Sequence, residues 1–260
     1  MESLLRDVRL AVRSLFRAPT FTLTAILTLA IGIGATVTIF SAVRAVLLRP
    51  LPFDAPDDLV QLAARETGNE YHYFSPPNFE DIRRESSGFV ELAALAETST
   101  ALTGNDASPE QVVSAAVTGS FFQVFGAAPV VGRTIRPEDA AAGADRVAVL
   151  SYPLWQRRFG GDPAVVGRVV RLDDVPYQVI GVMPAGFERP LRAELWMPLW
   201  FSNDDLATQR GAQYLLVYGR RKPGLTAPQA DARLEPVIAA IREAYPRNNP
   251  GRFARLAPLH

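Results

Sequence analysis

The sequence predicts an α+β protein in which one membrane-spanning helix near the N-terminus precedes a large mixed domain. Residues 20–43 contain no charged side chain, and a helix of about 20 apolar residues is enough to cross the core of a bilayer. Beyond residue 50, short β-type runs lie between two strand–helix segments. With 21% charged residues and a mean hydropathy of +0.06, the composition fits one folded domain and one membrane segment rather than several spans.

Residues 1–19 are expected to form an amphipathic helix at the cytoplasmic face of the membrane. Apolar residues recur there at helical spacing with arginines interleaved, a pattern typical of helices that lie at the headgroup level. The alternative is a frayed cytoplasmic tail. Four arginines would anchor this segment to the membrane surface: Arg6, Arg9, Arg13 and Arg17.

Residues 20–48 are predicted to be the transmembrane helix, with Thr20 as its N-cap. Four arginines precede the apolar run and only Arg44 and Arg49 follow it, so the N-terminus is expected in the cytoplasm and the chain after about residue 50 outside. One alternative is a buried helix of a soluble protein, which rarely runs this long without a charge. Another is a signal peptide, whose apolar region has only about 7–15 residues. An uncleaved anchor is therefore favoured.

Small residues along this helix predict a face against which another helix packs. Ala30, Gly34 and Thr38 lie four residues apart, as do Gly32 and Thr36, and small side chains let two helix backbones approach closely within a membrane. The alternative is chance, because membrane helices are rich in glycine and alanine. The predicted partners of this helix are the lipid bilayer and other membrane helices.

The external part is expected to begin and end with a strand followed by a helix. The first strand covers residues 59–63, and the helix after it starts at Ser75 as N-cap and runs to about residue 85. Near the C-terminus, a strand at residues 214–219 precedes a helix that opens with a capping box of Thr226 and Gln229. This order suggests a β-rich unit inserted into an outer α/β unit.

Residues 89–209, between these two segments, are predicted to be rich in strands. Short helices at residues 120–125 and 152–159 interrupt them, and the pair Asp173-Asp174 marks a hairpin turn. The expected strands cover residues 90–96, 111–118, 146–150, 165–172 and 177–183.

The sequence contains no pattern typical of catalysis, cofactor binding or metal binding. It has no cysteine and only two histidines, His72 and His260, and it lacks both the phosphate-binding G-x-x-x-x-G-K-[ST] loop and the G-x-S-x-G nucleophile motif. No basic face indicates nucleic acid as a partner. The chain is therefore predicted not to be an enzyme and to need no cofactor. An anchored hydrolase with an unrecognised site is the enzyme-class alternative.

Several conspicuous side chains are assigned structural rather than functional roles. The basic runs at residues 157–158 and 220–222 are expected to be solvated. His72 is expected to be an ordinary strand or loop residue rather than part of an aromatic ligand surface. Five aromatic residues are expected in the core rather than on a partner surface: Phe121, Phe122, Trp155, Trp196 and Trp200.

Longer stretches of the sequence resemble a known family. The run LTLAIGIGATVTIFSAVRAVLLRPLPF, followed by DAPDDLVQL, is similar to the first membrane span and exit segment of MacB/FtsX-like ABC transporter permeases, in particular the permease group abundant in acidobacteria. Further blocks resemble the MacB-type periplasmic core domain: VTGSFFQVFGAAPVVGRTIRPED, VAVLSYPLWQRRFGGDPAVVGRVVRL, YQVIGVMPAGF, LWMPL and YGRRKPGLTAPQADARL. Because these blocks follow one another in the family's order over nearly all 260 residues, the resemblance is specific.

The resemblance implies a permease of the bacterial inner membrane with a periplasmic domain at residues 49–260. That domain would combine a discontinuous porter-like α/β part, residues 57–88 and 210–260, with an inserted β-rich part, residues 89–209. Such permeases work with an ABC ATPase, with other permease helices or a second permease copy, and with a periplasmic protein partner, and they serve export or mechanotransmission. The alternative is a single-span anchored binding or scaffold module that works without an ATPase.

The family pattern continues with further membrane spans after the periplasmic domain, whereas this sequence has no second apolar run before it ends at His260. We therefore expect the chain to correspond to the N-terminal portion of a permease, either as a fragment or as a truncated product. Nothing in the sequence indicates the transported substrate.

Overall fold

The computed structural model describes residues 18–47, 53, 55–66, 69–104, 107–187, 192–248 and 253–259. The chain divides into two compact units, Met1–Pro50 and Leu51–His260. The four arginines of the predicted amphipathic segment lie outside the described residues: Arg6, Arg9, Arg13 and Arg17.

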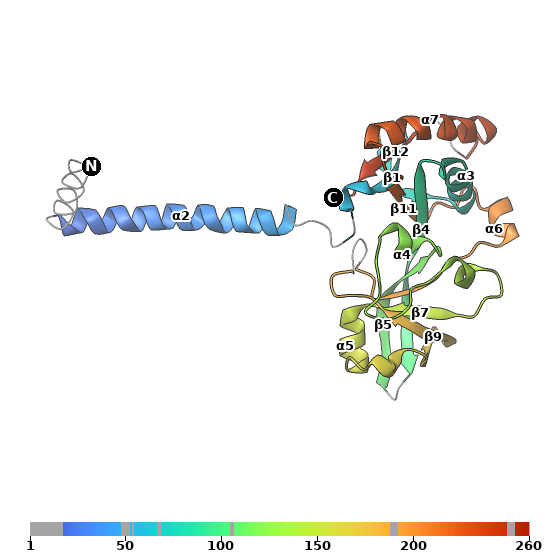
Figure 1. Ribbon diagram of the computed structural model, residues 1–260, viewed down its shortest axis with the longest axis horizontal. Helices are drawn as coiled ribbons and strands as arrows, with labels where there is room; N and C mark the ends of the chain where they lie inside the picture. The colour runs from blue at the N-terminus through green and yellow to red at the C-terminus, as the bar shows by residue number, and fades with distance from the viewer. Residues whose placement is uncertain are drawn as a thin grey trace. The chain divides into compact units, whose positions relative to one another are not determined.

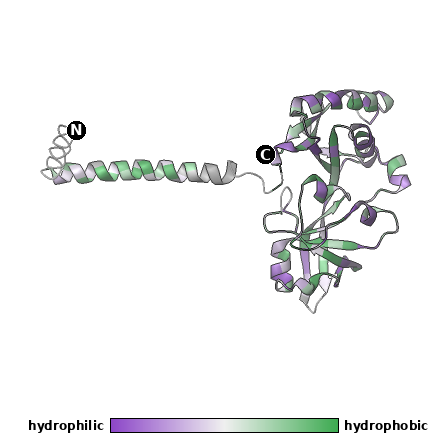
Figure 2. Cartoon of the chain, in the orientation of Figure 1, coloured by the Kyte–Doolittle hydropathy of each residue, from purple (hydrophilic) through white to green (hydrophobic). Residues whose placement is uncertain are grey.

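The first unit is described as one long helix, α2 (Pro19–Leu47). It is long and apolar enough to cross a membrane between Pro19 and Thr38, and Figure 2 shows its largely hydrophobic surface. Its threonines are compatible with an apolar surrounding because their hydroxyls donate to carbonyls one turn earlier, as Thr24 does to Thr20 at 2.9 Å. The prediction that Thr20 is the N-cap is wrong. The helix already begins at Pro19, whose fixed φ suits the first helical position.

The second unit is built on a sheet of twelve strands within the described residues, in the order β12-β1-β11-β4-β5-β10-β7-β9-β6, with β2 on β1, β3 on β11, and β8 on both β4 and β9. The strands are β1 (Leu59–Glu66), β2 (Asn69–Tyr71), β3 (Tyr73–Phe74), β4 (Val90–Gly104), β5 (Ala107–Val117), β6 (Val131–Gly132), β7 (Val147–Leu150), β8 (Val169–Leu172), β9 (Val175–Val182), β10 (Leu195–Pro198), β11 (Leu215–Arg221) and β12 (Phe253–Pro258). The helices are α3 (Pro76–Ser86), α4 (Phe121–Val124), α5 (Tyr152–Phe159), α6 (Asn203–Thr208) and α7 (Ala227–Ala244), with 3₁₀ turns η1 (Pro56–Asp58), η2 (Pro137–Ala140) and η3 (Pro163–Val165).

One end of this sheet forms an α/β layer. Strands β12, β1, β11 and the first half of β4 are antiparallel neighbours, and α3 and α7 lie together on one face of them (Figure 1). The core between helices and strands includes Phe79 and Ile82 of α3 and Leu234 of α7. Thr226 and Gln229 form the predicted capping box at the start of α7. Segments that are far apart in the sequence thus share one core.

The other end of the sheet closes into a six-stranded barrel. The ring runs β4-β5-β10-β7-β9-β8 and returns to β4. At the β8–β9 turn, Asp173 and Asp174 both have positive φ, as a two-residue hairpin turn requires, and the Asp173 carboxylate accepts the Ala101 N–H at 2.8 Å across the closing seam. Helix α5 contributes Leu154 and Trp155 to the barrel core.

The sequence-based elements differ from the structure mainly inside this barrel. The strand predicted at residues 90–96 continues as β4 to Gly104, because its second half pairs with β5 and β8. The strand predicted at residues 165–172 is shorter, because a turn at Gly167 (φ 92°) separates η3 from β8. Strands β10 and β12 and helix α6 were not predicted. Since β4 belongs to both the α/β layer and the barrel, the division at residues 89 and 209 stays a prediction.

Candidate functional site

A short segment at the start of the second unit is fixed to the domain by several contacts. We call residues 53 and 55–58 the linker segment. Ala55 has a left-handed conformation (φ 43°), and the Asp58 N–H donates to the Ala55 carbonyl at 3.0 Å across the 3₁₀ turn that follows. A non-glycine residue costs about 1–2 kcal/mol in this conformation, so neighbouring contacts must compensate for it.

The first contact is the burial of Phe53 among aromatic rings. Its side chain is only 8% exposed, and its ring centroid lies 4.9 Å from that of Phe125 and 5.7 Å from that of Phe187, both with an edge towards a face. Such geometry stabilises a ring pair by about 0.5–1.5 kcal/mol beyond its burial. We call the connected rings the aromatic cluster: Phe53, Phe121, Phe122, Phe125, Phe187, Trp196 and Tyr218.

The aromatic cluster joins the α/β layer to the barrel. Tyr218 lies in β11 and its ring centroid is 5.5 Å from that of Phe125, whereas Trp196 lies in barrel strand β10 and is 5.9 Å from Phe122. Burial raises the pKa of the Tyr218 phenol well above its ordinary value, and the charge of Glu97 adds to this. The phenol is therefore neutral across the physiological pH range, and the cluster carries no charge of its own there.

The second contact is made by Arg220 at the end of β11. Its Nη1 donates to the Ala55 carbonyl at 3.2 Å, and its Nε donates to the carbonyl of Val124, the last residue of α4, at 2.7 Å. One guanidinium therefore joins the linker segment to α4. Hydrogen bonds from a charged donor contribute more than neutral ones, about 1.5–3 kcal/mol each.

The third contact is made by the next residue, Arg221, whose side chain is 11% exposed. Its Nη2 donates to the Asp57 carbonyl at 2.5 Å and pairs with the Asp58 carboxylate at 3.0 Å. Its Nη1 donates to the carbonyl of Leu225, just before the cap of α7. The two arginines thus connect the linker segment to different faces of the sheet, one through α4 and the other through α7.

The chain leaves the α/β layer beside the place where it enters. Strands β1 and β12 are antiparallel, and the Leu259 N–H donates to the Leu59 carbonyl at 3.2 Å. Leu259 is partly buried against the same core cluster as Phe53. Leu59 and Leu259 therefore lie side by side at one end of these paired strands.

The sequence-based assignments of these residues are partly wrong. The basic run at residues 220–222 is not simply a solvated face, because Arg220 and Arg221 bind main-chain carbonyls more than 90 residues away. Of the five aromatic residues assigned to the core, four are buried, but Trp200 is 49% exposed. His72 is exposed next to β3. Phe53 had no predicted role, since only its position directly after Pro52 set it apart.

The small residues of α2 form two stripes rather than one face. Successive residues of an α-helix are turned by about 100°, so residues two apart are turned by about 200°. Gly32 and Thr36 therefore lie on roughly the opposite side from Ala30, Gly34 and Thr38, all five being exposed within this unit. The hydroxyls of the two threonines donate to the glycine carbonyls at 2.8 Å. Packing of a partner helix on either stripe stays a prediction.

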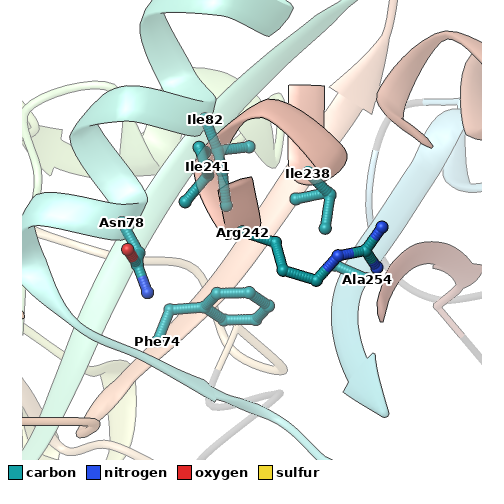
Figure 3. A pocket seen from close by; sticks show the side chains of 7 residues that line it. All are labelled: Phe74, Asn78, Ile82, Ile238, Ile241, Arg242 and Ala254. Carbon is teal, nitrogen blue, oxygen red and sulfur yellow. The ribbon is translucent and has the colours of Figure 1, made fainter. Parts of the chain in front are cut away.

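One cavity in the α/β layer is too small to be a ligand site. Figure 3 shows it between α3 and α7, lined by Phe74, Ile82 and the stem of Arg242 among others. Its volume of about 10 Å³ is that of a single water molecule at most. Within the residues that the structure describes, no group of three His, Asp or Glu side chains could hold a metal ion.

Several solved structures have the same fold. A domain of a permease protein from Porphyromonas gingivalis matches with a TM-score of 0.62 at 18% identity, over 80% of this chain and 93% of its own. The extracellular domain of the noncanonic ABC-type transporter YknZ from Gram-positive bacteria gives 0.55 at 16%, over 75% and 98%. The periplasmic region of MacB from Actinobacillus actinomycetemcomitans gives 0.56 at 12%, over 76% and 87%.

The fold is thus that of the external domain of an ABC-type permease. The family model for the MacB-like periplasmic core domain matches residues 22–237, and the chain belongs to this family. No curated protein sequence matches the chain. The domain that defines this family is a part of transporters and not a catalytic domain.

Proposed function

We propose that this chain is the N-terminal part of a MacB/FtsX-type permease of the bacterial inner membrane, in which α2 crosses the bilayer and residues after about 50 form the periplasmic domain. The N-terminus lies in the cytoplasm, where the arginines at 6, 9, 13 and 17 meet the membrane surface. A separate ABC ATPase moves the membrane helices, and the periplasmic domain converts that movement into export or a signal to a periplasmic protein partner.

The anchored linker segment is the observation that supports this proposal. A domain driven by a moving helix needs its first residues to be held firmly to the rest of the domain, whereas a module that is only tethered to the membrane does not. Phe53 is buried, and Arg220 and Arg221 bind the carbonyls of Ala55 and Asp57. Displacement of the segment would therefore displace the aromatic cluster and β11 with it.

Co-purification of an ATPase tests the proposal. The tagged chain, expressed in its own host, is expected to retain an ATPase with a phosphate-binding loop, and deletion of residues 1–48 is expected to abolish the association. The matched control deletes the same number of residues but replaces them with an unrelated membrane span. An ATPase retained equally by all three chains, or by none, would contradict coupling and favour an anchored scaffold module.

Reporter fusions test the orientation independently. Alkaline phosphatase fused after Leu51 or after Leu259 is expected to be active, because both sites lie in the periplasm on this account. A cytoplasmic reporter at the same two positions is expected to be inactive. Activity of the cytoplasmic reporter at either position would rule out the proposed topology.

A further inference from the structure

The domain also has a surface groove next to the residues that precede α4. Thr118, Ser120 and Trp200 contribute to a groove with a volume of about 290 Å³ at the junction of the α/β layer and the barrel. The remaining wall comes from α3, η2 and the segment around α6: Glu80, Arg83, Gly119, Pro137, Ala140, Ala142, Leu199, Phe201 and Leu206. We call this the junction groove.

Helix α4 belongs to the aromatic cluster and directly follows residues of the junction groove. Residues just before it line the groove, while Phe121 and Phe122 within it and Phe125 just after it contact the rings around Phe53. The two sets are separated by a single helical turn, which is about 5.4 Å long. A change in the position of Phe53 is thus one turn of helix away from the groove.

The start of α4 is held by side chains rather than by a regular strand. Thr118 and Ser120 bond to β4: the Ala94 N–H donates to the Thr118 hydroxyl at 3.0 Å, and the Ser120 hydroxyl donates to the Leu92 carbonyl at 3.0 Å. At its other end, α4 is held through the Val124 carbonyl by Arg220. The helix is also fixed by its buried Phe121 and Phe122 side chains and by the Thr118 N–H, which donates to the Ala94 carbonyl at 3.0 Å. It therefore moves as one piece together with the aromatic cluster.

The wall of the groove that η2 forms is in contact with the loop of residues 118–120, which precedes α4. A Cβ atom on Gly119 would lie 2.4 Å from Pro137, so the two backbones touch. Pro137 opens η2, and Pro137 and Ala140 of this turn both line the groove. Because closely packed backbones cannot compress, movement of the α4 loop must move η2 as well.

We propose that α4 couples the linker segment to the junction groove, so that release of Phe53 from the aromatic cluster loosens α4 and opens the groove. By thermodynamic reciprocity, anything that closes the groove holds the linker segment in place. The use of this device in the cell rests on the proposed function, since only a driven membrane helix would displace the linker segment.

Thiol labelling measures the opening directly, because the chain has no cysteine of its own. Ala140→Cys places one thiol in the groove wall, and the purified full-length chain in detergent is labelled with a maleimide dye. Phe53→Ala is expected to raise the labelling rate about fivefold, the factor that loss of an aromatic pair gives in an opening equilibrium. Arg220→Gln is expected to raise the labelling rate as well, and it replaces Phe53→Ala in the experiment if Phe53→Ala does not fold.

The matched control is Phe159→Ala, because Phe159 is 9% exposed, close to Phe53 at 8%, but packs in the barrel core. It is expected to leave labelling of Ala140→Cys unchanged, and a second thiol at Val166, outside the groove, detects general loosening. Equal labelling of wild type and Phe53→Ala, or equal acceleration by Phe159→Ala, would overturn the coupling. This result is independent of the ATPase co-purification, so failure of one test leaves the other standing.

Discussion

Arginines at two places in this domain make contacts of different kinds. Arg157 on α5 is 46% exposed and pairs with the carboxylates of Glu110 and Glu194 at 2.6 and 2.7 Å. Arg221 at the end of β11 is 11% exposed and binds the main-chain carbonyls of Asp57 and Leu225. A pair between surface side chains can dissolve without moving the backbone, whereas a bond to a carbonyl fixes the path of the chain. The contacts of Arg221 therefore fix the backbone of the domain, whereas the contacts of Arg157 join only side chains at its surface.

The pair of Arg133 and Asp139 lies between these extremes. The guanidinium reaches both carboxylate oxygens, at 2.6 and 2.9 Å, and also donates to the Thr134 carbonyl at 3.1 Å. The same carboxylate accepts the Arg136 N–H at 2.8 Å at the start of η2. This interaction combines a side-chain pair with a backbone cap, so its loss is expected to have an intermediate effect.

Arg221→Ala is expected to have the largest effect of the three. It removes bonds to two carbonyls and to the Asp58 carboxylate, and the free energy of unfolding of the external domain is expected to fall by about 2–4 kcal/mol. Urea unfolding followed by near-UV circular dichroism measures this. Arg221→Lys, which keeps the charge but not the planar fork, is expected to recover less than half of the loss. A change below about 1 kcal/mol for the alanine variant would place Arg221 with the surface arginines.

Asp139→Asn is expected to give a smaller loss with a characteristic pH dependence. Burial raises the pKa of the Asp139 carboxyl, but the hydrogen bonds from Arg133 and the Arg136 N–H, with both charges, together hold it below its ordinary value. The unfolded chain therefore takes up the proton at a higher pH than the folded chain does. The contribution is complete above about pH 4 and is lost as the pH falls below that value.

The variant is expected to be about 1 kcal/mol less stable than wild type at pH 7, and this difference is expected to shrink as the pH falls below about 4, because the wild-type carboxylate then takes up its proton. Thermal unfolding across that range provides the measurement. A constant difference between the two chains at all pH values would mean that the carboxylate charge is not what holds η2.

Arg157→Ala is expected to have the smallest effect. The hydrogen bonds that the Arg157 guanidinium donates to the carboxylates of Glu194 and Glu110 raise its pKa, but exposed pairs of this kind contribute less than about 1 kcal/mol to the free energy of unfolding. The loss of unfolding free energy is expected to be smaller still in about 1 M salt, because the screening length there is about 3 Å. A loss as large as that of Arg221→Ala, unaffected by salt, would remove the distinction between the two regions.

Local signals in the sequence were enough to predict the elements that flank the sheet. The capping box of Thr226 and Gln229 places the start of α7 correctly, because the bonds that form this cap lie within three residues of each other. The pair Asp173-Asp174 likewise predicts its own hairpin turn. In each case the interaction that decides the structure is local in the sequence.

The barrel and the candidate site depend on contacts that are remote in sequence, so local patterns could not predict them. The second half of β4 is polar at Glu97–Ser99 and gives no alternation typical of a strand, yet pairing with β5 makes it one. Arg221 looks like part of a solvated run until Asp57, 164 residues away, is placed beside it. A fixed linker segment has no signature in composition, because the groups by which the arginines hold it are its ordinary main-chain carbonyls.

Amide hydrogen exchange at Asp58 tests the central claim most directly. Its N–H donates to Ala55 in the turn that Arg220 and Arg221 hold. If the linker segment is part of the folded domain, this amide exchanges at least about a hundredfold more slowly than in an unstructured peptide, and the double variant Arg220→Ala/Arg221→Ala removes that protection while β1 keeps its own. Exchange at the unstructured rate in the wild-type chain would show that residues 53–58 are a loose tether and would contradict the account.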